Sequence, residues 1–92
     1  MATMGEIQTR NRIKIAVFAY AYEFKNDSLV SDAEFDELAK EVKAGLGIGT
    51  GNDKLDDFFA KEFVTDSGMW IHRHPELHKV CDMYHTIWKD EV

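Results

Sequence analysis

The hydrophobic positions in the first third of the chain repeat with the period of an α-helix, from about residue 5 to residue 24. One apolar stripe, with the spacing i, i+4, i+7 and i+11, consists of Ile13, Val17, Tyr20 and Phe24. A second stripe on nearly the opposite side of the helix consists of Ile15, Phe18 and Tyr22. A helix that is apolar on two sides has to be covered on both, either by its own fold or by a partner protein.

A second helix is predicted from Ser31 to about Lys43. Ser31 and Glu34 have the spacing of a capping box, in which the serine accepts the Glu34 amide and the glutamate side chain reaches back to the Ser31 amide. The apolar face of this helix consists of Phe35, Leu38, Ala39 and Val42.

Two further helices are predicted in residues 52–92. The third runs from an N-cap at Asn52 to about Phe63, and the fourth begins near Pro75, which suits the first helical position. The apolar stripe of the fourth helix consists of Leu77, Val80, Cys81, Tyr84, Ile87 and Trp88. Between them a short extended piece is expected around Met69 to Ile71, but no second alternating run is present to pair with it. The fold is therefore predicted to be all-α with about four helices.

Glycine residues dominate the stretch from Gly45 to Gly51, which joins the second and third predicted helices. Its G-x-G-x-G spacing is that of some phosphate-binding loops. It follows a helix rather than a strand, however, and lacks the GK[ST] ending of a Walker loop. We therefore interpret residues 44–51 as a flexible connection between helices.

The length and the charge narrow the class of protein. Ninety-two residues, 45% of them hydrophobic and 30% charged, predict a single globular domain over 1–92. The net charge of −6 disfavours direct binding to nucleic acid or to an anionic membrane surface. The longest apolar run, residues 15–22, is too short to span a membrane, and the first 14 residues do not resemble a signal peptide. A cytoplasmic location is therefore expected.

The single cysteine and the histidines offer little chemistry. Cys81 lies in the apolar stripe of the fourth helix, which predicts a buried structural thiol rather than a nucleophile. All four histidines, His72, His74, His78 and His85, lie near the C-terminus, and His78, Asp82 and His85 share one flank of the fourth helix. Two imidazoles and a carboxylate could bind Zn²⁺. This spacing is also common on polar helix flanks, so we predict no metal site and expect solvated or capping histidines.

Asp32 and Asp36 are neighbours on the flank of the second helix. Like charges at i, i+4 destabilise a helix by a few tenths of a kcal/mol. The helix dipole accounts for an acid in the first turn, as at Asp32, but less well for Asp36 in the second turn. The pair is thus a candidate for a functional role, against the alternative of a solvated helix flank.

The most specific sequence feature combines Tyr20-Ala-Tyr22, the turn Asn26-Asp27-Ser28 and the segment Leu29-Val-Ser-Asp-Ala-Glu-Phe-Asp-Glu-Leu38. Together they resemble the small N-terminal helical domain of bacterial NAD-dependent DNA ligases. In that family a tyrosine-rich helix precedes an (I/V)-S-D-A-E-Y-D-x-L helix. The resemblance covers residues 13–43, which it identifies as a helix-turn-helix core. Small free-standing proteins of this kind also suggest a bacteriophage origin, in which case the location is the host cytoplasm.

The resemblance implies a ligand. In the ligases this domain closes over the nicotinamide mononucleotide (NMN) half of NAD. The matching positions here are Tyr22, Asp32 and Asp36, while Phe35 replaces the motif's tyrosine and Glu23 stands where many ligases have histidine. These two departures remove a hydroxyl donor and add a negative charge, which disfavours phosphate contacts. Stacking on Tyr22 and carboxylate contacts to a ribose or a cationic ring remain.

Three functions follow as hypotheses. The first is a module that binds NMN, NAD or a similar pyridine nucleotide and needs no cofactor. It is expected to be non-catalytic, because the chain lacks the family's K-x-D-G lysine motif and its nucleotidyltransferase domain. The second is a small acidic interaction or regulatory protein that keeps the ligase-domain shape and binds a protein partner through its first helix. The third, an enzyme acting on NAD, ranks last because the sequence shows no nucleophile or orienting group beside the two aspartates.

Overall fold

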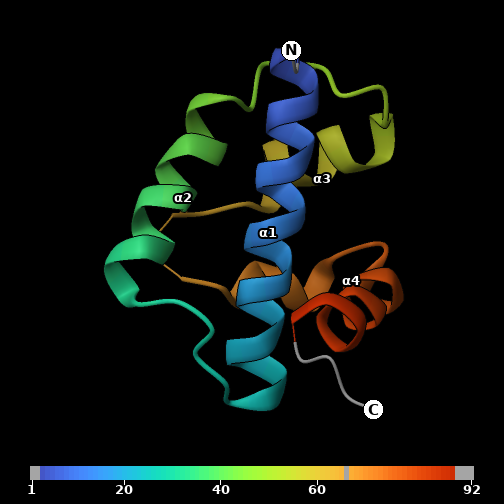
Figure 1. The fold of residues 1–92 in the computed structure, drawn as a ribbon. Helices are drawn as coiled ribbons and strands as arrows, with labels where there is room; N and C mark the ends of the chain where they lie inside the picture. Colours follow the sequence, from blue (N-terminus) through green and yellow to red (C-terminus); the bar gives the residue numbers. More distant parts are fainter. Residues whose placement is uncertain (1–2, 66, 89–92) are drawn as a thin grey trace.

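The computed structural model describes residues 3–65 and 67–88, and Figure 1 shows their arrangement. The helices are α1 (Met4–Lys25), α2 (Asp32–Ala44), α3 (Asp53–Glu62) and α4 (Leu77–Met83). A 3₁₀-helix, η1 (Met69–Arg73), precedes α4, and a π-helical turn, η2 (Tyr84–Trp88), follows it. Within these described residues there is no β-strand, so the all-α prediction is confirmed.

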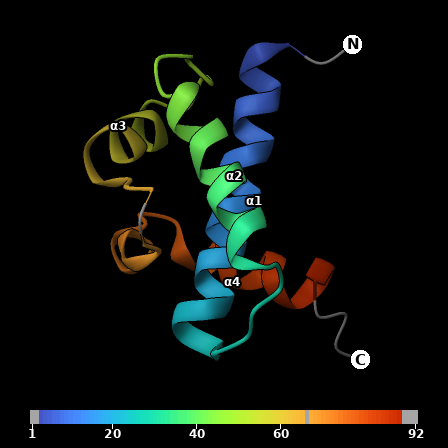
Figure 2. The ribbon, with the colours of Figure 1, turned by 90° about the vertical axis from the view of Figure 1, so that its left-hand side faces the viewer.

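Helix α1 is the central element of the fold. Helix α2 runs antiparallel along one side of it, and α4 and η1 pack against it as well (Figures 1 and 2). The radius of gyration is 12.5 Å, close to the value of about 12 Å expected for a compact chain of this length. The helices therefore form one compact body.

The two apolar sides of α1 are both covered by its own chain over the middle of the helix. The buried residues there are Ile15, Ala16, Val17, Ala19, Tyr20 and Ala21. The alanines allow neighbouring elements to approach closely, because they add little volume at the contact. The outer members of the predicted stripes differ: Tyr22 and Phe24 are 58% and 42% exposed.

Predicted caps define the starts of α2 and α3. Ser31 Oγ accepts the Glu34 amide at 3.1 Å, and Asn52 Oδ1 accepts the Leu55 amide at 3.1 Å. The second half of the predicted capping box differs, because the Glu34 carboxylate accepts the Ser31 hydroxyl rather than the Ser31 amide. Gly45 ends α2 and begins the glycine-rich connection, as the sequence predicted.

The extended piece predicted around Met69 to Ile71 is wrong, because this segment forms η1. Trp70 and Ile71 are both buried, whereas consecutive residues of a strand point to opposite faces. The tight turn also pairs its own backbone groups, with the Ile71 amide donating to Gly68 O and the His74 amide to Ile71 O, each at 3.1 Å. The Trp70 ring packs on Phe59 and Phe63 of the α3 region.

The fourth helix also departs from its prediction. Pro75 precedes it in a turn, and α4 begins two residues later at Leu77. The Glu76 amide donates to His74 Nδ1 at 3.0 Å, which closes a local turn before the helix starts. After Met83 the helix widens into η2, where the buried Tyr84 donates its hydroxyl to Asp27 Oδ2 at 2.8 Å.

Candidate functional site

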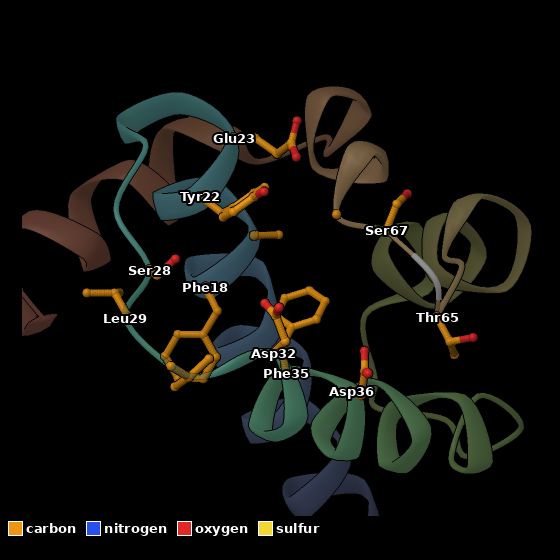
Figure 3. Close-up of a pocket in the computed structure, with 13 residues that line it drawn as sticks. Phe18, Tyr22, Glu23, Ser28, Leu29, Asp32, Phe35, Asp36, Thr65 and Ser67 are labelled. Atoms are coloured by element: carbon orange, nitrogen blue, oxygen red, sulfur yellow. The ribbon is translucent and has the colours of Figure 1, made fainter.

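All five residues that the ligase resemblance singled out line one pocket of about 400 Å³. Figure 3 shows Tyr22 and Glu23 at the C-terminal end of α1, across the opening from Asp32, Phe35 and Asp36 of α2. We call this pocket the α1–α2 pocket. The full set of lining residues is Phe18, Ala19, Tyr22, Glu23, Ser28, Leu29, Val30, Asp32, Phe35, Asp36, Thr65, Ser67 and Gly68. Its volume falls in the range of about 300–1,000 Å³ that is typical of small-molecule sites.

The connection between α1 and α2 sets the relative position of these side chains. Asn26 ends α1 in the left-handed conformation (φ 51°), which turns the chain back towards α2. Ser31 then caps α2, so that Asp32 and Asp36 lie in its first two turns. The Tyr84 hydroxyl donates a hydrogen bond to Asp27, which lies in the turn between α1 and α2. The placement of Asp32 and Asp36 relative to Tyr22 and Glu23 thus depends on local capping and on one long-range contact.

Three carboxylates line the α1–α2 pocket, and its described lining residues include no lysine, arginine or histidine. Asp32 and Asp36 are exposed and have no hydrogen-bond or ion-pair partner among the described residues. Glu23 differs, because its side chain is only 16% exposed and lies 3.2 Å from His72 Nε2. The pocket therefore favours a cationic or hydrogen-bond-donating ligand and opposes a phosphate.

Aromatic rings supply the apolar part of the pocket. Phe18 and Phe35 are partly buried in its wall, while the Tyr22 ring is 58% exposed at its edge. An exposed aromatic face beside carboxylates can contact a flat cationic ring through cation–π attraction and stacking. The arrangement can bind and orient such a ring, but it contains no evident nucleophile.

The structure adds residues that the sequence analysis missed. Thr65 and Ser67 lie on a third side of the α1–α2 pocket (Figure 3), and Gly68 also lines it. A Cβ atom at Gly68 would lie 3.2 Å from Ala19 Cβ, so this segment packs closely on α1. These residues lie some thirty positions beyond Asp36 and form no motif with it, so nothing in the sequence indicated their position.

His72 is the other unexpected neighbour. It comes from η1 and meets Glu23, the residue that stands where many ligases have histidine. Its ring also packs against Phe24, with 4.6 Å between the ring centroids. A histidine thus lies beside this part of the site, although it is supplied by a different element from the one that the resemblance implies.

The remaining histidines and Cys81 are not grouped as metal ligands in the described part of the chain. In residues 3–65 and 67–88, no group of three or more His, Cys, Asp or Glu side chains is placed to hold a metal ion. Burial lowers the pKa of His74 to about 4, and this ring packs against Phe58. Cys81 is only partly buried, and it accepts a hydrogen bond from the Tyr20 hydroxyl at 3.1 Å. Burial raises the pKa of Tyr20 to about 12, so this hydroxyl keeps its proton at neutral pH.

Comparison with known protein families, curated proteins and solved structures finds no match to this chain. The ligase resemblance therefore rests on the residues that carry it. Separately, none of the helices in the described part of the chain has the length and apolar character needed to cross a membrane.

Proposed function

We propose that this protein is a non-catalytic, ligase-related module that binds the pyridinium nucleoside part of NMN, NAD or a similar pyridine nucleotide. One observation carries the proposal. The five side chains that the resemblance implies, Tyr22, Glu23, Asp32, Phe35 and Asp36, come from two helices and line the same pocket. The positively charged nicotinamide ring suits three carboxylates and an exposed tyrosine ring.

The expected affinity is modest. An exposed carboxylate contributes about 1 kcal/mol or less to an ion pair, and an exposed cation–π contact contributes about 0.5–1 kcal/mol. Asp32, Asp36 and Tyr22 are all exposed, so their contributions lie in this low range. Together these contributions reach at most about 3 kcal/mol, so the expected Kd is several millimolar or weaker, compared with about −4 kcal/mol for a Kd of 1 mM. The absence of a cation from the described lining residues predicts that the phosphate of NMN adds little.

An amide NMR titration of the labelled protein tests this proposal, with NMN and NAD as ligands and AMP as the control. We expect shifts at Tyr22, Asp32, Phe35 and Asp36 with NMN and NAD, and none there with AMP. The variant Asp36→Asn should weaken NMN binding about fivefold, since it removes about 1 kcal/mol of attraction. Glu37→Gln is the matched control, because Glu37 is an exposed acid on the same helix outside the pocket lining. A spectrum that stays silent through the millimolar range contradicts the proposal.

The second candidate, a protein-interaction role, loses part of its basis. The middle of α1 is covered on both sides by α2, α4 and η1, so the doubly apolar pattern needs no partner there. The exposed apolar side chains that remain on α1 lie towards its ends and are Met4, Ile7, Tyr22 and Phe24. Binding of a protein partner through α1 stays a prediction. Co-purification of a stable complex in which Ile7 or Phe24 becomes protected would favour it.

A further inference from the structure

A second pocket lies against the N-terminal half of α1 and shares no lining residue with the α1–α2 pocket. It has a volume of about 240 Å³ and is bounded by α1, α3, the 50–52 segment and α4. We call it the Arg12 pocket. Most of its wall is apolar, and the apolar lining residues are Ile13, Ala16, Leu55, Phe59, Val80 and Met83.

Arg12 is the unusual member of this pocket. It is 4% exposed, and its Nη1 atom pairs with the Asp56 carboxylate of α3. The guanidinium carbon lies 5.1 Å from the centre of the Phe59 ring. The two other nitrogens, Nε and Nη2, are buried and have no hydrogen-bond partner among the described residues.

These two unpartnered nitrogens form one edge of the guanidinium group. The N–H bonds of Nε and Nη2 on that edge are parallel, so they match the two oxygens of a carboxylate in a bidentate pair. A buried charged donor left without an acceptor destabilises the fold, because its lost hydration is not replaced by a hydrogen bond. A ligand that supplies the acceptor recovers this free energy, whereas a purely apolar ligand does not.

The other charged side chains in the pocket lining, and the Asp56 partner of Arg12, all have partners. Asp56 also accepts hydrogen bonds from the Thr50 hydroxyl at 2.7 Å and the Thr50 amide at 3.2 Å, so it is held in place on the Nη1 side. Lys79 pairs with Glu76 at 3.0 Å. His74 is neutral at pH 7, because burial lowers its pKa to about 4. Among the described lining residues, Arg12 is thus the one whose buried side-chain donors, Nε and Nη2, have no hydrogen-bond partner.

We propose that the Arg12 pocket binds a small monocarboxylate, whose carboxylate pairs with Nε and Nη2 of Arg12 and whose apolar body packs against Leu55, Val80 and Met83. The volume of about 240 Å³ limits the ligand to a body about the size of one ring. Inorganic phosphate fits less well, because an apolar wall does not satisfy its remaining oxygens. Since Nε and Nη2 are buried, the ligand has to displace the side chains that cover them as it enters.

Benzoate is the probe for an amide NMR titration, with benzamide as an uncharged ligand of the same shape and inorganic phosphate as an anion without an apolar body. We expect benzoate to shift the amides of Thr9, Ile13, Leu55 and Val80, with a millimolar Kd. Benzamide and phosphate should bind at least tenfold more weakly, which corresponds to about 1.4 kcal/mol. Equal binding of benzoate and benzamide, or no shifts with benzoate, overturns the proposal.

Two variants locate the binding to this pocket. Arg12→Lys keeps a positive charge but lacks the two parallel donors, so it should bind benzoate at least tenfold more weakly. Leu55→Trp fills the pocket from its partly exposed wall without changing Arg12, so it keeps the test decisive if Arg12→Lys does not fold. Lys61→Gln, at an exposed position of α3 outside the pocket, is the control and should bind benzoate as the wild type does. Wild-type affinity in Leu55→Trp contradicts the proposed location.

Discussion

At the scale of single residues, the carboxylates discussed above are of two kinds, exposed ones without a partner among the described residues and one held by hydrogen bonds. Asp32 and Asp36 are exposed and unpartnered among the described residues, so their charge is available to a ligand. Asp56 instead joins α1 to α3, since it accepts hydrogen bonds from Thr50 and pairs with the buried Arg12. The hydrogen bond from Thr50, followed by that from Arg12, lowers the pKa of Asp56. Its contribution to stability is therefore present above about pH 4 and is lost as the pH falls below its folded-state pKa.

The Arg12–Asp56 pair gives a residue-scale prediction. Asp56→Ala leaves the Arg12 guanidinium buried with no acceptor, so the free energy of unfolding at pH 7 should fall by about 3 kcal/mol. The neighbouring Asp57 is exposed and, among the described residues, its carboxylate pairs with Lys61 alone, so Asp57→Ala should change the free energy of unfolding by no more than about 0.5 kcal/mol. Urea unfolding of both variants measures the difference. A similarly small loss of unfolding free energy in both variants would show that the Arg12–Asp56 pair does not stabilise the fold as a buried pair.

At the scale of the elements, the sequence predicted what local chemistry determines. Residues three or four positions apart in the sequence determine the hydrophobic periods of α1, α2 and α3 and the caps at Ser31 and Asn52. The structure confirms these three helices and both caps. The η1 turn could not be predicted in the same way. Its conformation depends on Trp70 packing against Phe59 and Phe63, which are contacts between separate elements. The late start of α4 depends similarly on the side chain of His74.

The end of α2 offers an element-scale prediction. A Cβ atom at Gly45 would lie 2.3 Å from Gln8 Oε1, and Gln8 is buried with its amide donating to Val42 O at 3.0 Å. Gly45→Ala should therefore displace Gln8 and destabilise the protein by about 1–3 kcal/mol. Gly47→Ala, where nothing lies within 4 Å of the new Cβ, should be neutral or slightly stabilising. Thermal unfolding measures the melting temperatures of the two variants. Equal melting temperatures would contradict the close contact between Gly45 and Gln8.

At the scale of the whole molecule, the fold brings distant segments to one site. The ligase-like residues of α1 and α2 could be predicted to meet, because a short turn joins two antiparallel helices. The third wall of the α1–α2 pocket, residues 65 and 67–68, depends on how the C-terminal half folds back over α1. The Arg12 pocket was not predicted at all, because α1, α3 and α4 form it jointly and no local pattern marks Arg12 as buried.

The same C-terminal packing predicts how stability depends on pH. His74 has its folded-state pKa lowered to about 4 by burial, and its Nδ1 atom accepts the Glu76 amide, which requires the neutral ring. Because the folded state holds the ring neutral, this group stabilises the fold at pH values above about 6.5, the ordinary pKa of histidine. This stability is lost as the pH falls from about 6.5 towards 4, and solvent screening of the partly exposed ring keeps the loss below the full value for a buried group. His74→Gln should remove this part of the pH dependence, whereas the exposed His78→Gln should keep it. Urea unfolding between pH 7 and pH 4 measures it, and an unchanged slope in His74→Gln would contradict the assignment.

The proposed function requires the α1–α2 pocket to recognise the positive charge of a pyridinium nucleoside. The most direct test compares oxidised nicotinamide riboside with its reduced form, which has almost the same shape but an uncharged ring. Amide NMR titrations should give a millimolar Kd for the oxidised form, with shifts at Tyr22, Asp32 and Asp36. The reduced form should bind at least fivefold more weakly, since about 1 kcal/mol of charge attraction is lost. Equal affinity for the two forms, or shifts that avoid these residues, would show that the carboxylates of this pocket do not select a cationic ring.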